Sequence, residues 1–426
     1  MKKIVCLIIV FASLFLASCG GKATGTTQTE ATENPTPITA PYTSASHYAA
    51  VDTPSRILLF HGGTLFYYSK ADGESYHFCF DPLCRHPLRS HCVARQFMSH
   101  TSRIDACVYS EKYNRFYFAR GQKIYSTSFD ASDLKLELSL GENGIIDGSG
   151  SQETMSYDFY IRRIRIYGDY IYFLHANDDS GKWQILRYNI ITRKAEEMTS
   201  GKTEWVISYE LANEYIYFKT LDNNNYFKYY TTDMDFNDRK VVTDPIYFEN
   251  PGVSMGLYDG KYFYDETARG KELYRLDPLT NEKELIVKDD RLTGCADMLC
   301  VKENDGVYVT SENVVALGYI IDEVHGKYDV GTNKNIIWRV SFDGEFTKVL
   351  DFQRGQIDTM NFVDGGVVIH FSRIYHKEIN VEDPKTAGSV FVLFEIDENG
   401  MFVNPKPIGN NADNEDLIEF FNGDWQ

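Results

Sequence analysis

The stretch FCFDPLCRHPLRSHC, from Phe78 to Cys92, places three cysteines and two histidines within fifteen residues. Thiolates and imidazoles are the ligands that tetrahedral zinc prefers, so this stretch is a candidate metal centre. The candidate ligands are Cys79, Cys84 and Cys92, together with one of His86, His91 or Cys107. Four and seven residues separate successive cysteines, which differs from the short spacing of a zinc knuckle. Disulfide bonds are therefore the favoured interpretation, zinc and free thiols are the alternatives, and no metal is predicted.

The number of cysteines supports disulfides. Once a leader that contains Cys6 is removed and Cys19 is modified, the disulfide candidates are Cys79, Cys84, Cys92, Cys107, Cys295 and Cys300. An even number in an exported chain favours pairing. The first four allow three connectivities, among which the sequence does not choose. Cys79 is expected on a strand, and Cys295 with Cys300 can close a small loop.

Export is indicated at the N-terminus. Lys2 and Lys3 precede an apolar run over residues 4–16, which is typical of a secretory signal peptide. The run is shorter than the roughly 20 residues of a membrane span. Residues 16–19, Leu-Ala-Ser-Cys, resemble the bacterial lipobox, which implies that Cys19 becomes the lipidated N-terminus. We therefore predict a signal peptide over 1–18, a disordered Thr/Pro-rich tether over 19–46, and a lipid-anchored, extracytoplasmic protein in a bacterial cell envelope.

Residues 47–426 are expected to form one globular domain. The chain is 43% hydrophobic and 14% aromatic, which is enough to build a large core. The formal charge is −18, and removal of the leader with its two lysines leaves −20, which argues against nucleic acid as a partner. Gly-x-Ser-x-Gly, P-loop and His-Glu-x-x-His motifs are missing from the sequence. We predict no catalytic residue and no cofactor.

Short strands of period two recur every 45 to 60 residues and predict the fold. Aromatic-rich segments occur at 65–68, 115–118, 170–173, 215–218, 262–265, 307–310 and 367–370. Glycine turns precede several of them, a second strand follows each, as at 75–82 and 273–278, and a third often closes the unit. A meander of this kind repeated about seven times predicts an all-β propeller, with seven blades favoured and six or eight as alternatives.

The lipobox, the tether and the repeated pattern DGxYFYxxxxxxxxLYRLDP resemble bacterial lipoproteins with a TolB-like or DUF5050-like propeller, a group of largely unknown function. The resemblance covers roughly residues 50–410 and implies the fold without an activity. We expect a non-catalytic propeller that binds a protein, peptide or glycan. The expected recognition surface comprises the long segments 140–158, 311–334 and 375–388, the second of which can hold an extra hairpin. The alternatives are a glycan hydrolase or lyase whose carboxylates meet at the channel mouth, and an envelope scaffold.

Overall fold

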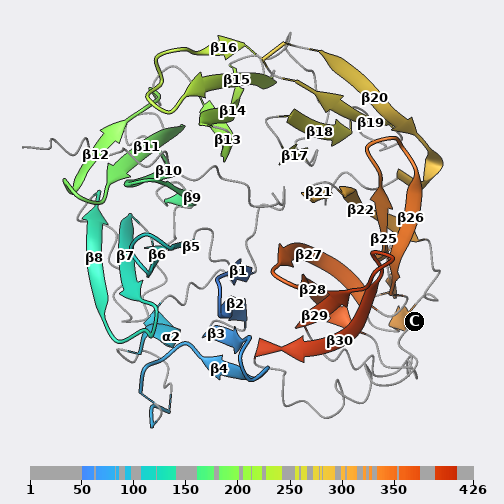
Figure 1. Ribbon diagram of the computed structural model, residues 1–426, viewed down its shortest axis with the longest axis horizontal. Helices are drawn as coiled ribbons and strands as arrows, with labels where there is room; N and C mark the ends of the chain where they lie inside the picture. The colour runs from blue at the N-terminus through green and yellow to red at the C-terminus, as the bar shows by residue number, and fades with distance from the viewer. Residues whose placement is uncertain are drawn as a thin grey trace, which may run out of the picture. The chain divides into compact units, whose positions relative to one another are not determined.

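A computed structural model describes most of the region from residue 50 to residue 409 (Figure 1). The described residues are 50–61, 64–81, 83–85, 92–96, 107–120, 122–140, 161–176, 182–200, 205–212, 214–222, 227–241, 255–258, 261–265, 272–277, 279–280, 282–292, 299–302, 305–313, 320–322, 326–328, 333–352, 355–374 and 389–409. All of them belong to the compact unit Pro37–Gln426. The predicted leader, Cys19 and the tether lie outside the described residues. Within the described part, no helix is long and apolar enough to cross a membrane.

The described residues contain seven four-stranded antiparallel sheets, which we number in chain order. Sheet 1 holds β1 (Ala50–Asp52), β2 (Arg56–His61), β3 (Thr64–Ser69) and β4 (Ser75–His77); sheet 2 holds β5 (Cys107–Ser110), β6 (Arg115–Arg120), β7 (Lys123–Ser128) and β8 (Leu134–Ser139); sheet 3 holds β9 (Arg162–Tyr167), β10 (Tyr170–Ala176), β11 (Trp183–Asn189) and β12 (Lys194–Glu197). Sheet 4 holds β13 (Trp205–Ala212), β14 (Tyr215–Leu221), β15 (Phe227–Asp233) and β16 (Lys240–Val241); sheet 5 holds β17 (Met255–Tyr258), β18 (Lys261–Asp265), β19 (Glu272–Leu276) and β20 (Lys283–Lys288). Sheet 6 holds β21 (Leu299–Lys302), β22 (Gly306–Asn313), β25 (Asn333–Val340) and β26 (Phe346–Asp351); sheet 7 holds β27 (Gly355–Val363), β28 (Gly366–Ile374), β29 (Val390–Ile396) and β30 (Phe402–Ile408).

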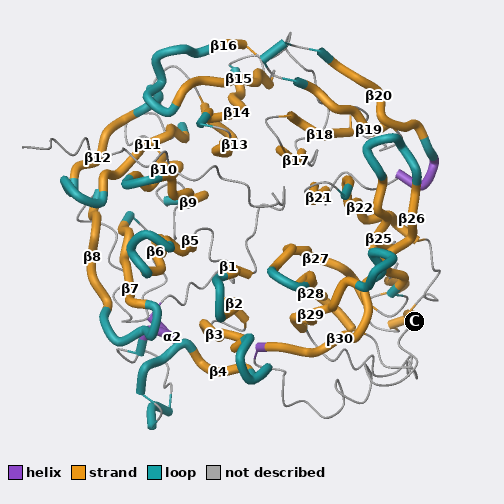
Figure 2. Tube along the Cα trace, viewed as in Figure 1, coloured by secondary structure: helices purple, strands orange, loops and turns teal. Residues whose placement is uncertain are grey.

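The sheets follow one another around a central axis, with the first strand of each sheet nearest the middle and the fourth at the periphery (Figure 1). This arrangement confirms the predicted all-β propeller. A two-stranded hairpin of β23 (Ile320–Asp322) and β24 (Gly326–Tyr328) is inserted between the second and third strands of sheet 6. The extra hairpin predicted for this segment is therefore confirmed. The remaining helical structure in the described residues is short: α2 (Val93–Gln96) and the 3-10 turn η2 (Asp290–Leu292) (Figure 2).

Period-two alternation explains why an aromatic strand is buried on both of its faces. In β10, Ile171 packs into a core shared with sheet 2, whereas its neighbour Tyr172 packs into a core shared with sheet 4. Both side chains are almost fully buried. Successive residues of a strand point to opposite faces, so a strand between two neighbouring sheets must be apolar throughout. Full burial of one such side chain contributes about 1.5–3 kcal/mol.

Tyrosine hydroxyl groups tie neighbouring sheets together at the edges of these cores. Tyr188 in sheet 3 donates a hydrogen bond to the carbonyl of Glu137 in sheet 2, at 3.0 Å. Tyr172 in sheet 3 donates to the carbonyl of Met234, in the turn between β15 and β16 of sheet 4, at 3.2 Å. The ring supplies apolar area while the hydroxyl satisfies a backbone acceptor. The high tyrosine content is therefore explained by the contacts between sheets.

Sheets 1 and 7 meet through side chains. Leu59 and Phe66 of sheet 1 share a buried cluster with Val368 and Phe391 of sheet 7. At the surface, the amide of Gly409 donates to Ser75 Oγ at 3.0 Å. Each four-stranded sheet is built from strands in chain order, so no strand is exchanged between sheets 1 and 7.

The first repeat differs from its prediction. Residues 65–68 lie in the third strand of sheet 1, whereas the other aromatic segments lie in the second strand of their sheets. The strand predicted over 75–82 ends at His77, because the amide of Cys79 turns back to donate to the His77 carbonyl at 2.7 Å. The prediction that Cys79 lies on a strand is therefore wrong. The chain leaves the sheet immediately before it.

Candidate functional site

A turn centred on Asp81 positions the first two cysteines of the cluster. The side-chain Oδ1 of Asp81 accepts a hydrogen bond from the amide of Leu83 at 2.9 Å. Its carbonyl accepts one from the amide of Cys84 at 3.1 Å and one from the thiol of Cys79 at 3.7 Å. Aspartate commonly closes turns in this way. Cys79 and Cys84 are therefore held on either side of one short turn.

Buried residues anchor both ends of the segment. Phe78, which precedes Cys79, is 1% exposed and lies 5.2 Å from the ring of Phe116 in sheet 2. Val93, which follows Cys92 and opens α2, is buried in the same cluster between sheets 1 and 2. The first and last cysteines therefore each lie next to a side chain fixed in the core.

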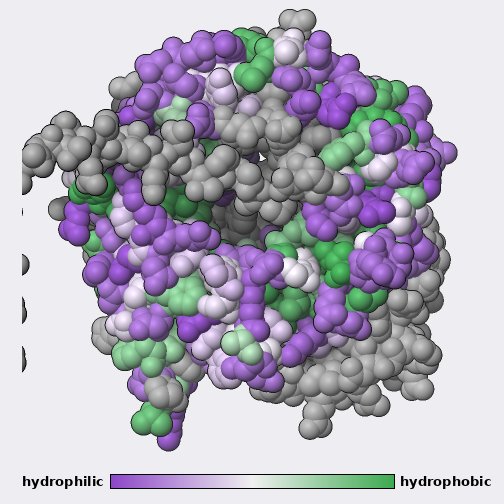
Figure 3. Space-filling view, in the orientation of Figure 1, coloured by the Kyte–Doolittle hydropathy of each residue, from purple (hydrophilic) through white to green (hydrophobic). Residues whose placement is uncertain are grey.

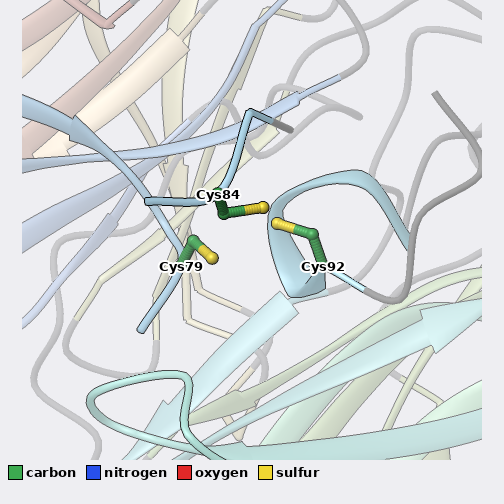
Figure 4. Close-up of side chains that lie close together, drawn as sticks. All are labelled: Cys79, Cys84 and Cys92. Carbon is green, nitrogen blue, oxygen red and sulfur yellow. The ribbon is translucent and has the colours of Figure 1, made fainter. Parts of the chain in front are cut away.

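These anchors bring three thiols together (Figure 4). The sulfur atoms of Cys79, Cys84 and Cys92 all lie within 4.8 Å of one another. The sulfurs of Cys84 and Cys92 point toward each other, and Cys79 lies beside them (Figure 4). Burial raises the pKa of the Cys92 thiol to about 12, and a hydrogen bond with Cys79 acts in the same direction. The cluster combines residues separated by thirteen positions in the chain.

The structure does not show the predicted disulfides at Cys79, Cys84, Cys92 and Cys107, all of which are present as thiols. A disulfide requires two sulfurs about 2.05 Å apart. Cys107 is buried in the core between sheets 1 and 2, where burial alone raises its pKa well above the ordinary value. It is not one of the three grouped thiols. His86, His91, Cys295 and the side chain of Cys300 lie outside the described residues.

The segment after β4 also exposes apolar side chains. Phe80 is 62% exposed and Leu83 is 87% exposed, and Tyr76 at the end of the sheet is 42% exposed. The described part of this segment projects beyond the rim of sheet 1 (Figure 2), and hydrophobic surface is visible on the projection (Figure 3). Sequence reasoning missed this surface because it placed residues 75–82 on a strand of the first repeat that ends in a turn. The apolar pair flanking Asp-Pro, in a position where loops are usually polar, was the available signal.

A second group of charged residues lies on the inner strands of sheets 3 and 4. Arg165 of β9 makes two hydrogen bonds to the carboxylate of Glu210 on β13, at 2.8 and 2.7 Å. Arg163 approaches the same carboxylate at 3.6 Å. Lys219 on β14 is 6% exposed. Burial lowers its pKa to about 8, and the positive charge of Arg163 acts in the same direction.

This charged group does not supply the pair of carboxylates that the hydrolase or lyase alternative requires. Among the described residues, Glu210 is the one buried carboxylate, and two arginines neutralise it. Such a group joins two sheets, and its geometry alone suggests no reaction. Most residues of the segments 140–158, 311–334 and 375–388, which were predicted as a recognition surface, lie outside the described residues.

Comparisons with known proteins support the fold but do not assign the chain to a family. No protein-family model matches the chain, and no curated protein matches its sequence. Among solved structures, an oligogalacturonate lyase from Vibrio parahaemolyticus matches with a TM-score of 0.50 and 7% identity, over 85% of this chain and 92% of that one. A puromycin hydrolase matches with a TM-score of 0.51 and 11% identity, over 85% of this chain and 53% of that one.

A putative TolB from Agrobacterium tumefaciens is also among the similar structures, with a TM-score of 0.36 and 12% identity, over 59% of this chain and 87% of that one. At such low identities these likenesses concern the fold alone. The arrangement of the sheets defines the class as an all-β propeller, and the likeness to the two structures with TM-scores of 0.50 and 0.51 agrees with this fold.

Proposed function

We propose that this chain is a lipid-anchored, extracytoplasmic propeller, with each four-stranded sheet forming one blade, that binds a partner protein without catalysing a reaction. The observation that carries the proposal is the exposure of Phe80 and Leu83, at 62% and 87%, on a projecting segment anchored in the core at both ends. Neighbouring apolar side chains exposed on a projection are typical of an interaction surface.

The chemistry of this segment favours a protein over a glycan or nucleic acid. The leucine side chain offers no hydrogen bond, whereas an apolar patch on a partner protein would cover both residues. A formal charge of −18 opposes phosphate-rich partners. The Asp81 turn orders the segment before binding, which lowers the entropic cost of association. An envelope scaffold would use the same surface, with several partners in place of one.

Site-specific photo-crosslinking tests this proposal. Benzoyl-phenylalanine replaces Phe80 or Leu83 in the full chain, which is expressed in the organism that naturally produces it. Ile191 is the matched control, because it is 67% exposed on the turn between β11 and β12, away from the segment. We expect one protein adduct of defined mass from Phe80 and Leu83 and none from Ile191. Adducts of several masses would favour the scaffold, and equal adducts at Ile191, or none anywhere, would refute the proposal.

The membrane anchor is tested separately. Cys19→Ala removes the proposed lipid attachment site while leaving the propeller unchanged. We expect the variant to move from the membrane fraction to the soluble fraction, because two or three acyl chains are needed for stable anchoring. Retention of Cys19→Ala in the membrane fraction after a carbonate wash would contradict lipid anchoring and leave the binding proposal to its own test.

A further inference from the structure

The three thiols after β4 converge from two separate segments onto one small volume. Cys79 and Cys84 come from the Asp81 turn, and Cys92 comes from the residue before α2. In the described residues they are the one group of three potential metal ligands whose ligand atoms lie close together. We propose that these three cysteines bind a single zinc ion, with a solvent molecule in the fourth position. This inference is independent of the proposed partner.

The distances suit such an ion. With zinc–sulfur bonds of about 2.3 Å, tetrahedral geometry places sulfur atoms about 3.8 Å apart. The three sulfurs lie within 4.8 Å of one another before any ion is bound. A contraction of about 1 Å is within reach of side-chain rotation, since Cys79 and Cys84 are only partly buried. Binding replaces the three thiol protons, which pass to solvent.

A disulfide accounts for the cluster less completely than a metal ion does. Three thiols cannot all pair, so a bond between any two leaves the third sulfur packed beside the bridge. Cys107 does not solve this problem, because it lies in the core and outside the group. A metal ion uses all three sulfurs equally. The structure thus favours a zinc site, which the cysteine spacing alone had made an alternative to disulfides.

The ion would have a definite mechanical role. It would join the two ends of the projecting segment, since Cys79 follows the buried Phe78 and Cys92 precedes the buried Val93. The exposed Phe80 and Leu83 lie inside the closed loop. A bound ion therefore holds the projection in one conformation and stabilises it against opening.

Differential alkylation of the full chain in detergent separates the three possible states of the thiols. The protein is purified without reductant, its zinc content is measured, and portions are treated with iodoacetamide alone, after a chelator, or after a reductant, followed by mass spectrometry. We expect one zinc per chain, and alkylation of Cys79, Cys84 and Cys92 only after chelation. Alkylation that requires a reductant would show a disulfide, and alkylation without a chelator would show unliganded thiols. Either result overturns the proposal.

Variants then assign the ligands. Cys84→Ser should weaken zinc binding by more than about 100-fold in competition with a chromogenic chelator, because loss of outer-shell partners alone costs about 10- to 100-fold. The matched control, Cys107→Ala, removes a cysteine outside the group and should leave zinc affinity within about 3-fold. Equal effects of the two would overturn the assignment. Absorption spectroscopy of the unmodified chain with added cobalt does not depend on the folding of a variant. Absence of a thiolate-to-cobalt charge-transfer band would also refute the site.

Discussion

Lys219 is a buried lysine whose positive charge lowers the stability of the folded protein, because burial removes the charge from water. The residue lies in the middle of β14, is 6% exposed, and has the cationic Arg163 nearby. Burial is the larger cause that lowers its pKa from 10.5 to about 8. Lys219→Met keeps an unbranched side chain of similar length and removes the charge. The free energy of unfolding of the two proteins should therefore differ in a way that depends on pH.

The sign and size of this dependence follow from the pKa. Below pH 8 the lysine is protonated in both the folded and the unfolded chain, so the folded state bears the full penalty of about 3 kcal/mol. Between pH 8 and pH 10.5 the unfolded chain binds more protons, so the stability of the unmodified protein rises with pH relative to the variant. From about pH 7 to about pH 9.5 the relative gain is about 2 kcal/mol.

Urea unfolding followed by tyrosine fluorescence at both pH values measures this difference directly. Lys228→Met is the control, because Lys228 lies on the neighbouring β15 with a side chain that is 35% exposed and pairs with Asp222 at 3.4 Å. We expect a change of less than about 0.5 kcal/mol with pH for the control. A Lys219→Met difference that also stays constant within about 0.5 kcal/mol would refute the claim that burial penalises this charge.

Three further predictions test the packing and the surface charges. Gly366→Ala should lower the free energy of unfolding by about 1–3 kcal/mol in urea, because its Cβ would lie 2.3 Å from the carbonyl oxygen of Phe394; wild-type stability would contradict the close packing of β28 on β29. Phe371 lies in the core between sheets 6 and 7, so Phe371→Ala should lower the free energy of unfolding by about 3–5 kcal/mol. Leu279→Ala, at a half-exposed position, should lower it by less than about 0.5 kcal/mol, and equal losses for the two variants would count against the core assignment. Arg115 holds the pKa of Asp133 below its ordinary value, and solvent screens this partly exposed pair. Between about pH 5 and pH 3 the unmodified protein should therefore lose about 0.5 kcal/mol more stability than Asp133→Asn, and parallel acid unfolding curves would argue against this ion pair.

The sequence predicted the strands that are buried on both faces. Segments such as residues 170–173 and 307–310 are recognisable because an apolar, aromatic run with a preceding turn has few other structural explanations. The peripheral strands were harder to recognise. β12 consists of Lys-Ala-Glu-Glu and is exposed at every residue, so no alternation of hydrophobic and polar residues marks it. Its strand conformation depends on pairing with β11, which is a tertiary interaction.

The candidate site was predicted in composition and not in geometry. Spacing identified the cysteines of residues 78–92, yet it gave no distance between them and favoured disulfides. The convergence of Cys92 on Cys79 depends on Val93 being buried between sheets 1 and 2, a contact made by residues far apart in the chain. The charged group around Lys219 was missed for the same reason, although a lysine inside the apolar strand YIYFKTL was a usable signal.

The side-chain contact between sheets 1 and 7 has a consequence for how the chain folds. Every four-stranded sheet is complete within one continuous stretch of sequence, apart from the hairpin inserted in sheet 6. A chain that emerges N-terminus first can therefore form each sheet in turn from contacts of low sequence separation, which favours rapid folding. The hydrophobic contact between sheets 1 and 7 includes Ile408, so it can form only after almost the whole described part of the chain has been synthesised. Until then Leu59 and Phe66 lack their partners, and a truncated chain carries an apolar face by which chaperones and proteases can recognise it as unfinished.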